Sequence, residues 1–209
     1  MFRKKLLLAS LISASMIPAI AQADTKNFEG LSAGLNLNLI SGGVKLSVGA
    51  VSLDSLGGKQ TQSVAVDAAY GFAMGGKGVL TIGIDADLSD AKIASFSDPD
   101  GDFSAKQKNR YGIYVAPGLA VTKDALVYGK IGYNKMKGDI SDEETGVSAS
   151  LNFDGVSYGV GAKIMLSKEA FIRVEASRYT FSSKSDPAIP AISYKPSATV
   201  GTIGIGMNF

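Results

Sequence analysis

The chain contains no cysteine, no histidine and no tryptophan. Without cysteine, the fold is held without disulfide bonds. Without histidine, the Ser-His-Asp triad, His-assisted acyl transfer and His-ligated zinc are excluded, because each needs an imidazole. Excess charge is also scarce, at a net +2 over 209 residues, which is too balanced for a nucleic-acid-binding protein. Composition therefore argues against most familiar enzyme classes and against nucleic acid as a partner.

Long apolar runs are equally scarce, and the single pronounced one lies at the start of the chain. Arg3, Lys4 and Lys5 precede an apolar stretch over residues 6–20, and the small residues Ala21 and Ala23 follow. This order predicts a secretory signal peptide over residues 1–23 that is cleaved after Ala23. A membrane-anchoring helix is the alternative, but it needs about 20 apolar residues and is not normally followed by such a site. Residues 24–209 then form one exported domain.

The rest of the sequence alternates between apolar and polar residues with a period of two, which is typical of strands with one apolar face. The first such segment starts at Leu31, and others lie near residues 64–72 and 80–88. Further strands are expected from about residues 107, 124, 152, 170 and 197. The sequence thus predicts an all-β protein of about eight strands, each about as long as a tilted strand that crosses a bilayer.

The connections between these strands alternate in length. Short turns are expected at residues 74–77, 118–123 and 167–169, and long, polar connections at 40–60, 90–106, 137–151 and 182–196. Strict alternation places all tight turns at one end of an antiparallel up-and-down barrel and all long loops at the other. Prolines agree with this layout, because none is expected at the centre of a strand; Pro117 is assigned to a strand end.

The alternating stretch over residues 44–53 does not fit eight strands. It is either a ninth strand or a β extension above the membrane. We favour the extension, because bacterial single-chain barrels have an even number of strands.

Alternation alone does not distinguish a membrane barrel from a soluble, lipocalin-like barrel that hides its apolar face around a ligand. Two features favour the membrane. Aromatic residues on the apolar face gather near strand ends, as in interfacial girdles: Phe72, Tyr111, Tyr133 and Phe209. The opposite face carries small residues, as a narrow lumen requires: Gly159, Gly161, Gly204 and Gly206. We therefore predict a transmembrane β-barrel.

Several short motifs support a family resemblance. They are Phe28-Glu29-Gly30, Ala69-Tyr70-Gly71-Phe72, Ile82-Gly83-Ile84-Asp85-Ala86-Asp87, residues 127–133, residues 158–162 and the terminal Gly204-Ile205-Gly206-Met207-Asn208-Phe209. In this order they resemble the outer-membrane β-barrel family that contains opacity-type and OmpA/OmpX-type barrels. The resemblance implies that Phe209 is the signal for the barrel-assembly machinery. Some relatives carry an appended peptidoglycan-binding domain, and none is expected here, because the sequence ends at Phe209.

Eight charged residues fall on the polar face of their strands and are expected to point into the lumen. They are Asp67, Asp85, Asp87, Arg110, Lys130, Lys163, Arg173 and Glu175. Cross-strand pairing is expected between Asp85 or Asp87 and Lys108 or Arg110, and again around Lys163, Arg173 and Glu175. The favoured interpretation is a buried ion network that fills a narrow barrel. The alternative is a narrow path for ions or small solutes through the same groups.

Two other charged segments are weak candidates for sites. The segment 98–102 resembles a calcium loop but lacks the ligand spacing of an EF-hand, and a solvated turn is the simpler interpretation. Asp139, Asp142, Glu143 and Glu144 form an acidic loop tip that is explained by solubility. We predict no metal and no cofactor. Cations near the loop end are positioned to meet lipopolysaccharide phosphates: Lys59, Lys92, Lys135, Lys137 and Lys184.

These observations predict an integral outer-membrane protein with a structural or surface-interaction role, exerted through four long extracellular loops. A small porin-like channel is the alternative. No catalysis is expected, since lipid-modifying barrel enzymes rely on a catalytic histidine that this chain lacks. The expected surroundings are outer-membrane lipid, lipopolysaccharide and, during insertion, the barrel-assembly machinery; a surface ligand would bind through the loops, and the protein is expected to be a monomer.

Overall fold

The computed structural model of this protein describes residues 25–48, 51–56, 60–98, 101–142, 148–185 and 190–209. The signal-peptide prediction, with Ala21 and Ala23, lies outside the described residues and stays a prediction. The described part begins with a 3-10 turn, η2 (Lys26–Phe28), and then consists of strands. No described helix is both long enough and apolar enough to span a membrane.

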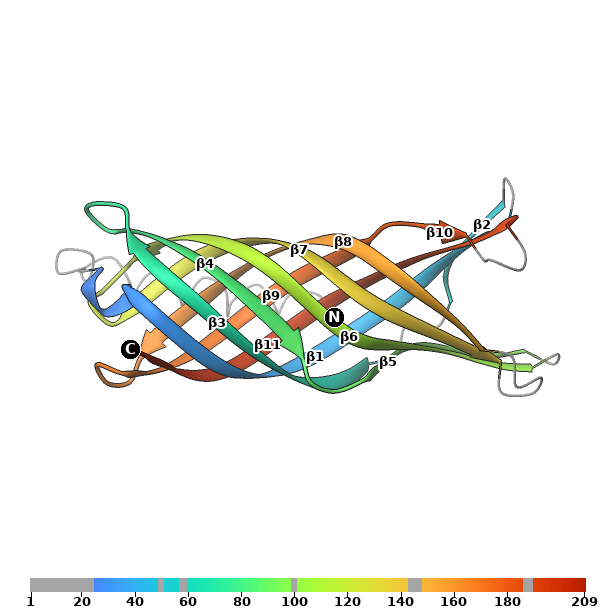
Figure 1. Ribbon diagram of the computed structural model, residues 1–209, viewed down its shortest axis with the longest axis horizontal. Helices are drawn as coiled ribbons and strands as arrows, with labels where there is room; N and C mark the ends of the chain where they lie inside the picture. The colour runs from blue at the N-terminus through green and yellow to red at the C-terminus, as the bar shows by residue number, and fades with distance from the viewer. Residues whose placement is uncertain (1–24, 49–50, 57–59, 99–100, 143–147, 186–189) are drawn as a thin grey trace, which may run out of the picture.

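Eight long antiparallel strands form a closed barrel (Figure 1). They are β1 (Gly30–Val48), β3 (Gln60–Ala73), β4 (Gly78–Asp87), β6 (Gly101–Ala120), β7 (Ala125–Asp142), β8 (Ser148–Met165), β9 (Ala170–Phe181) and β11 (Ile192–Asn208). Each strand pairs with the next one in this order, and β11 closes the barrel on β1, where Leu35 lies opposite Ile205. The predicted fold class is confirmed.

The two ends of the barrel differ as the connection lengths predict. Residues 74–77, 121–124 and 166–169 form tight turns at one end, which we call the turn end. The carboxyl terminus lies at the same end (Figure 1), where the backbone N–H of Phe209 donates to the carbonyl of Leu31. The long connections lie at the opposite end, which we call the loop end.

Much of each predicted long loop is continued strand. β6 has 20 residues, about twice the length that a tilted strand needs to cross a bilayer. Three short strands add to the loop end: β2 (Val51–Leu56) on β1, β5 (Ala91–Asp98) on β6, and β10 (Lys184–Ser185) on β11. The long connections expected from the sequence are therefore shorter than predicted, because the paired strands continue past the apolar belt.

The stretch at residues 44–53 is a β extension, as favoured. Residues 44–48 continue β1, and β2 folds back on them so that Val48 lies opposite Val51. The alternation at 44–53 thus reflects a hairpin beyond the barrel wall rather than a ninth strand.

The distribution of side chains is the reverse of that in a soluble protein: apolar side chains face outward and polar ones face the interior. Along β3, Val64 and Val66 are exposed, while Ala65 between them and Ser63 and Asp67 on either side are buried. The same arrangement recurs around the barrel, where Val160 is 66% exposed. Since apolar groups avoid water, an apolar outer surface of this extent must face lipid. The membrane barrel is favoured over the soluble one for this reason.

Pro117 lies near the turn end of β6, which ends at Ala120, so the proline is close to a strand end, as the sequence predicts. The β6–β7 register pairs Val115 with Ile131 and Gly118 with Tyr128, and has no pair at residues 116 and 117. Proline has no N–H, so Pro117 interrupts the ladder on the side that faces Gly129. On the other side, Pro117 still pairs with Leu80 of β4.

Candidate functional site

The lumen is the candidate site, because it holds the buried charges of the protein. All eight predicted residues point into it: four carboxylates and four cations, so their formal charges cancel. They lie between two apolar layers. The turn-end layer consists of Phe28, Val79, Ala120, Leu126, Met165 and Phe171. The loop-end layer consists of Ile40, Val44, Ala91, Met136, Phe153, Tyr179, Phe181, Ala198 and Val200.

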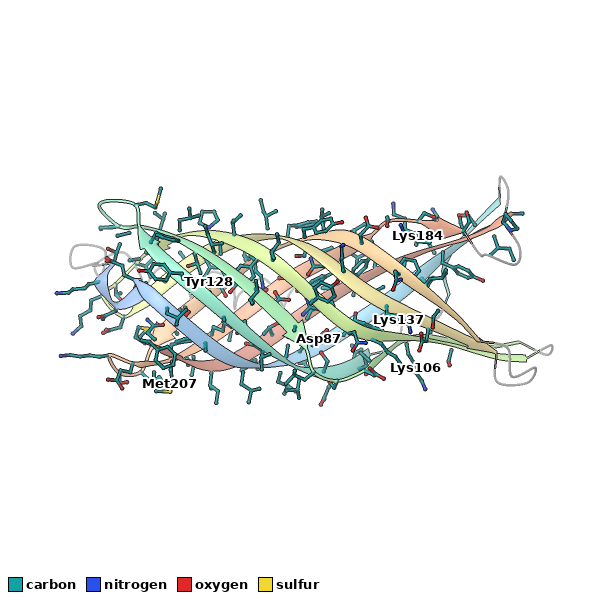
Figure 2. The ribbon with its side chains drawn as sticks, in the orientation of Figure 1. Asp87, Lys106, Tyr128, Lys137, Lys184 and Met207 are labelled. Atoms are coloured by element: carbon teal, nitrogen blue, oxygen red, sulfur yellow. The ribbon has the colours of Figure 1, made fainter. Side chains whose placement is uncertain are left out.

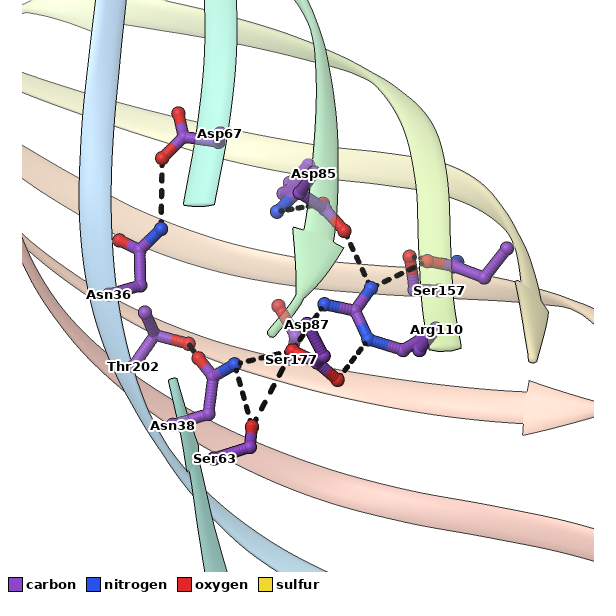
Figure 3. A network of polar contacts seen from close by, with 12 residues as sticks. Asn36, Asn38, Ser63, Asp67, Asp85, Asp87, Arg110, Ser157, Ser177 and Thr202 are labelled. Atoms are coloured by element: carbon purple, nitrogen blue, oxygen red, sulfur yellow. Dashed lines mark hydrogen bonds and ion pairs between the residues drawn. The ribbon is translucent and has the colours of Figure 1, made fainter. Parts of the chain in front are cut away.

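Arg110 of β6 is the centre of the network on the loop side (Figure 3). Its Nη1 donates to Asp85 Oδ1 at 2.6 Å, while Nε and Nη2 donate to the two oxygens of Asp87 at 2.8 and 3.1 Å. The Asp87 side chain is 1% exposed. The ring of Tyr179 lies 5.1 Å from the guanidinium carbon and covers it. Charge-assisted, bidentate pairs of this kind are the strong ones among hydrogen bonds.

Neutral side chains complete the surroundings of Asp87. Gln107 Nε2 donates to Asp87 Oδ2 at 2.6 Å, and Asn38 Nδ2 donates to Oδ1 at 3.1 Å. Thr202 Oγ in turn donates to Asn38 Oδ1 at 2.8 Å. Figure 3 shows Asn38, Arg110 and Thr202, which come from β1, β6 and β11, gathered around Asp87 of β4, so Asp87 links strands far apart in the sequence.

Lys130 of β7 connects two carboxylates across the middle of the lumen. Its Nζ lies 3.4 Å from Asp85 Oδ2 and 3.2 Å from Glu175 Oε1. The Tyr114 ring lies 4.3 Å from the ammonium nitrogen, an arrangement that favours the cation. Glu175 also accepts hydrogen bonds from Tyr128 Oη at 3.2 Å and Ser177 Oγ at 2.6 Å.

Arg173 of β9 pairs with Asp67 of β3 across the lumen. Asn36 lies between the two: its Oδ1 accepts from Arg173 Nη2 at 2.8 Å, and its Nδ2 donates to Asp67 Oδ1 at 2.9 Å. Asn36 is therefore an orienting group for the pair, with both ends of its amide used.

Lys163 does not pair with Glu175, and this part of the prediction was wrong. Lys163 lies opposite Arg173 in the β8–β9 register, but its Nζ donates to Asn208 Oδ1 at 2.9 Å and lies 3.9 Å from the Phe171 ring. The reason is the shape of the lumen: Glu175 is already engaged by Lys130, and Lys163 extends toward the turn end instead.

Lys108 does not pair with Asp85 or Asp87, which corrects a second pairing. The β6–β7 register shifts between Lys108 and Tyr111, and Asn109 there has a φ of 47°. This β-bulge changes the parity of the strand, so Gln107 points inward and Lys108 outward. Lys108 Nζ binds Asp139 Oδ2 at 2.7 Å on the outer surface.

The Lys108–Asp139 pair lies beyond the apolar belt. The hydrogen bonds from Lys108 and Ser150 hold the pKa of Asp139 below its ordinary value, and Asp139 correspondingly raises the pKa of Lys108. In the same region, Lys184 Nζ lies 3.1 Å from Asp154 Oδ1. The hydrogen bonds from Lys184 and Ser182 lower the pKa of Asp154.

Two cavities that the described residues enclose in the lumen are small. One cavity of about 30 Å³ lies between Ser32, Tyr114, Tyr128 and Arg173, and one of about 10 Å³ lies beside Asp87 and Arg110. Each is at most of the order of a single water molecule. Among the described residues, no buried side-chain nitrogen or oxygen lacks a hydrogen-bond partner. The charges therefore satisfy one another in a packed interior.

Sequence reasoning missed the neutral members of the network. Asn36, Asn38, Gln107, Asn134 and Tyr179 are all buried. Most of them could have been found from their position on the polar face of a strand, because that face points into the lumen rather than into water. Gln107 could not, because the bulge at Asn109 turns it to the lumen side.

The structure describes only some residues of the calcium-like segment, the acidic loop tip and the loop-end cations. The side chains of 98–102 and of 142–144 lie outside what the structure describes. Among the described residues, no three His, Cys, Asp or Glu side chains are grouped as a metal site would require. Of the loop-end cations, Lys135 and Lys137 are exposed on the outer face and Lys184 is paired with Asp154; Lys59 and the side chain of Lys92 are not described. Figure 2 places Lys137 and Lys184 toward the loop end.

Phe209 lies at the turn end with its side chain 73% exposed. This position is accessible to an assembly factor, and the assembly role stays a prediction.

Solved structures with the same fold include the outer membrane protein OprG from Pseudomonas aeruginosa, at 14% identity and a TM-score of 0.57, covering 87% of this chain and 96% of that one. Neisserial surface protein A matches at 13% identity and a TM-score of 0.51, covering 87% and 98%. The outer membrane protease OmpT from Escherichia coli matches at 11% identity and a TM-score of 0.51, covering 86% and 96%. At these identities the likeness shows the fold alone.

No curated protein matches the sequence. The model of the outer membrane protein beta-barrel domain, in contrast, matches residues 6–209, nearly the whole chain. The inside-out barrel, the network in its lumen and this match lead to one conclusion: the chain belongs to the outer membrane protein β-barrel domain family.

Proposed function

We propose that this protein is a non-conducting outer-membrane barrel that acts through the surface it presents beyond the membrane, in a structural or surface-interaction role. The observation that supports the proposal most directly is the lumen, where four carboxylates and four cations compensate one another between two apolar layers. An ion would have to displace these pairs and then cross the apolar layers, where it would lose its hydration.

The part of the barrel beyond the apolar belt supports the second half of the proposal. β1 and β11 remain paired out to Val48 and Ile192, and β6 and β7 remain paired out to Phe103 and Asp142. Paired strands present a defined surface, and a surface ligand would meet this sheet and the segments that join it. Lipopolysaccharide surrounds this region in the outer leaflet, and we include it among the proposed partners.

We propose no catalytic role. The chain has no histidine, and the buried carboxylates of the lumen are each held by cations or amides. The likeness to the protease OmpT extends to the fold and to nothing more specific.

Conductance of the refolded protein in a planar bilayer tests the proposal. We expect no stable channels. Channels whose ion selectivity changes when Lys130 or Arg173 is replaced by Gln would overturn the proposal in favour of a small pore. Lys168→Gln is the matched control, since Lys168 is an exposed cation at the turn end, outside the lumen.

A further inference from the structure

We propose that the β6–β9 side of the barrel binds one molecule of lipid A, with its phosphates at Lys135, Lys137 and Arg178 and an acyl chain in the groove beneath them. Two separate features of the outer surface support this: a groove in the lipid-facing wall, and a set of cations where that wall meets the headgroups. This proposal rests on the proposed function in one respect: both place ligand binding on the outer surface and not in the lumen.

The groove lies in the apolar belt. Two open hollows of about 850 and 500 Å³ adjoin each other and share Pro117, Gly129, Val160 and Ala176. The floor consists of residues with little or no side chain, Gly129, Ala162 and Ala176, whereas the neighbouring outward residues are larger. The groove is thus formed by a local lack of side-chain bulk across β6, β7, β8 and β9.

Because the groove lies in the lipid-facing wall, the ligand that fits it is a hydrocarbon chain. The flanking side chains Ile131, Tyr158 and Val160 are between 59% and 66% exposed, and all face lipid. Within a bilayer the hydrophobic effect does not favour one apolar surface over another. Shape and van der Waals contact therefore decide where an acyl chain is held on the barrel wall. A concave apolar track retains one acyl chain longer than the convex wall around it.

The groove ends at a cation. Arg178 of β9 and Thr199 of β11 line its loop-end part. Arg178 lies on the outer face, held by two neutral acceptors: Nη1 donates to Thr199 Oγ and Nη2 to Ser197 Oγ, both at 2.9 Å. These bonds orient the guanidinium without neutralising it, and none of the described carboxylates forms an ion pair with it.

Two more cations lie where the apolar belt ends on β7, which is separated from Arg178 on β9 by β8. Lys135 and Lys137 of β7 are exposed just beyond the apolar residues Ile131 and Tyr133. In the β6–β7 register, Lys137 lies directly opposite Lys108. Asp139 binds Lys108 and is close enough to Lys137 to be affected by its charge, so one described carboxylate stands against two cations here. The described carboxylates nearby are already bound: Asp139 by Lys108, and Asp154 by Lys184.

The opposite side of the barrel lacks this arrangement among its described residues. Where the apolar belt ends on β1 and β3, the first polar outward residues are Ser41 and Gln62, neither of them charged. Lys45 of β1 and Lys195 of β11 follow further along their strands, opposite each other. The boundary cations and the groove therefore coincide on the β6–β9 side, whereas the described residues of β1 and β3 place no cation at the boundary.

Lipid A combines the two chemistries that this side would recognise. Long loops mark the outer face of such barrels, and basic residues next to a membrane segment attract anionic headgroups. In the outer leaflet the abundant anionic lipid is lipopolysaccharide, whose lipid A carries phosphates and several acyl chains. A phosphate at the boundary cations places a chain at the open end of the groove.

Native mass spectrometry of the purified barrel, titrated with diphosphoryl lipid A, tests the proposal. We expect one preferred lipid per barrel, and affinity that falls about fivefold for each boundary cation removed in Lys135→Gln combined with Arg178→Gln. The matched control, Lys45→Gln combined with Lys195→Gln, removes the same charge from β1 and β11 at a point beyond the boundary and outside the groove lining, and should leave the affinity unchanged.

A second pair of variants tests the groove. A Cβ at Gly129 would meet nothing closer than the Gly159 carbonyl at 4.0 Å, so Gly129→Leu fills the groove without disturbing the barrel. We expect weaker lipid A binding in Gly129→Leu and in Ala176→Leu, but not in Ala68→Leu, which adds the same bulk to the lipid-facing side of β3. Heat-dependent electrophoretic migration verifies that each variant folds.

Three outcomes would overturn the proposal. Equal losses in the test and control variants would indicate general electrostatic attraction. Phosphatidylglycerol binding as tightly as lipid A, with the same sensitivity to the substitutions, would indicate a site for any anionic lipid. Full binding by all variants would place the lipid elsewhere. None of these bears on conductance, so failure here leaves the closed-barrel proposal to its own test.

Discussion

Arg110 binds Asp87 through two parallel hydrogen bonds, from Nε at 2.8 Å and from Nη2 at 3.1 Å, inside a lumen where the Asp87 side chain is 1% exposed. The remaining guanidinium nitrogen binds Asp85. One cation thus compensates two buried carboxylates on β4, and Arg110 reaches them from a β-bulge on the neighbouring strand.

Replacing Arg110 by Ala should destabilise the barrel by about 3 to 5 kcal/mol, since it leaves a buried charge without its partner. Urea unfolding of the protein in detergent micelles, followed by electrophoretic migration, measures the loss. Arg110→Met combined with Asp85→Asn and Asp87→Asn removes all three charges and should recover part of the stability. An unchanged midpoint in Arg110→Ala would show that water reaches the network.

Parity along a strand follows from the period of two, and it is the basis on which the sequence predicts which residues face the lumen. In the structure the eight charged residues take part in contacts within the barrel, from Asp67 on β3 to Glu175 on β9. Parity says nothing about which lumenal side chains meet. The pairing of Arg173 with Asp67 spans the lumen and depends on the curvature of the closed barrel, and adjacent-strand reasoning misses it.

The error at Lys108 has a local backbone cause. The bulge at Asn109 reverses the parity of Lys108, and the sequence carries no clear signal for a residue with positive φ at that point. Pro117 follows the preference of proline for strand ends. The β6–β7 ladder is interrupted at Pro117, which has no N–H to donate, while its pairing with β4 continues.

Restoring the missing donor at Pro117 should stabilise the β6–β7 seam. Pro117→Val supplies an N–H opposite Gly129, and one net hydrogen bond contributes about 1 kcal/mol; within lipid no water substitutes for it. Native-state hydrogen exchange should show slower exchange at Gly129 and Ile131. Pro117→Ala supplies the same N–H with a smaller side chain, so an effect confined to the valine variant would mean that packing, not the donor, is responsible.

The carboxyl group of Asp139 should titrate below the ordinary aspartate pKa of about 3.9, because Lys108 and Ser150 donate to it. A lowered folded pKa means that this pair contributes stability above the ordinary pKa and loses it as the pH falls through the folded value. NMR titration of the carboxyl carbon measures the pKa. Lys108→Gln should raise it, whereas the pKa of Asp154, lowered by Lys184, should not move. High salt weakens the effect, since the pair is exposed.

Phe171 should be among the most costly positions in the barrel to truncate. Its ring is 2% exposed, packs in the turn-end layer and lies 3.9 Å from the ammonium nitrogen of Lys163. Phe171→Ala should therefore cost about 3 to 5 kcal/mol, measured by urea unfolding in micelles. Phe72→Ala is the matched control, because Phe72 is 44% exposed on the outer face of β3 and lipid replaces most of its contacts. Equal losses in the two variants would contradict the assignment of Phe171 to a packed interior, since only a ring surrounded by protein leaves a cavity when it is removed.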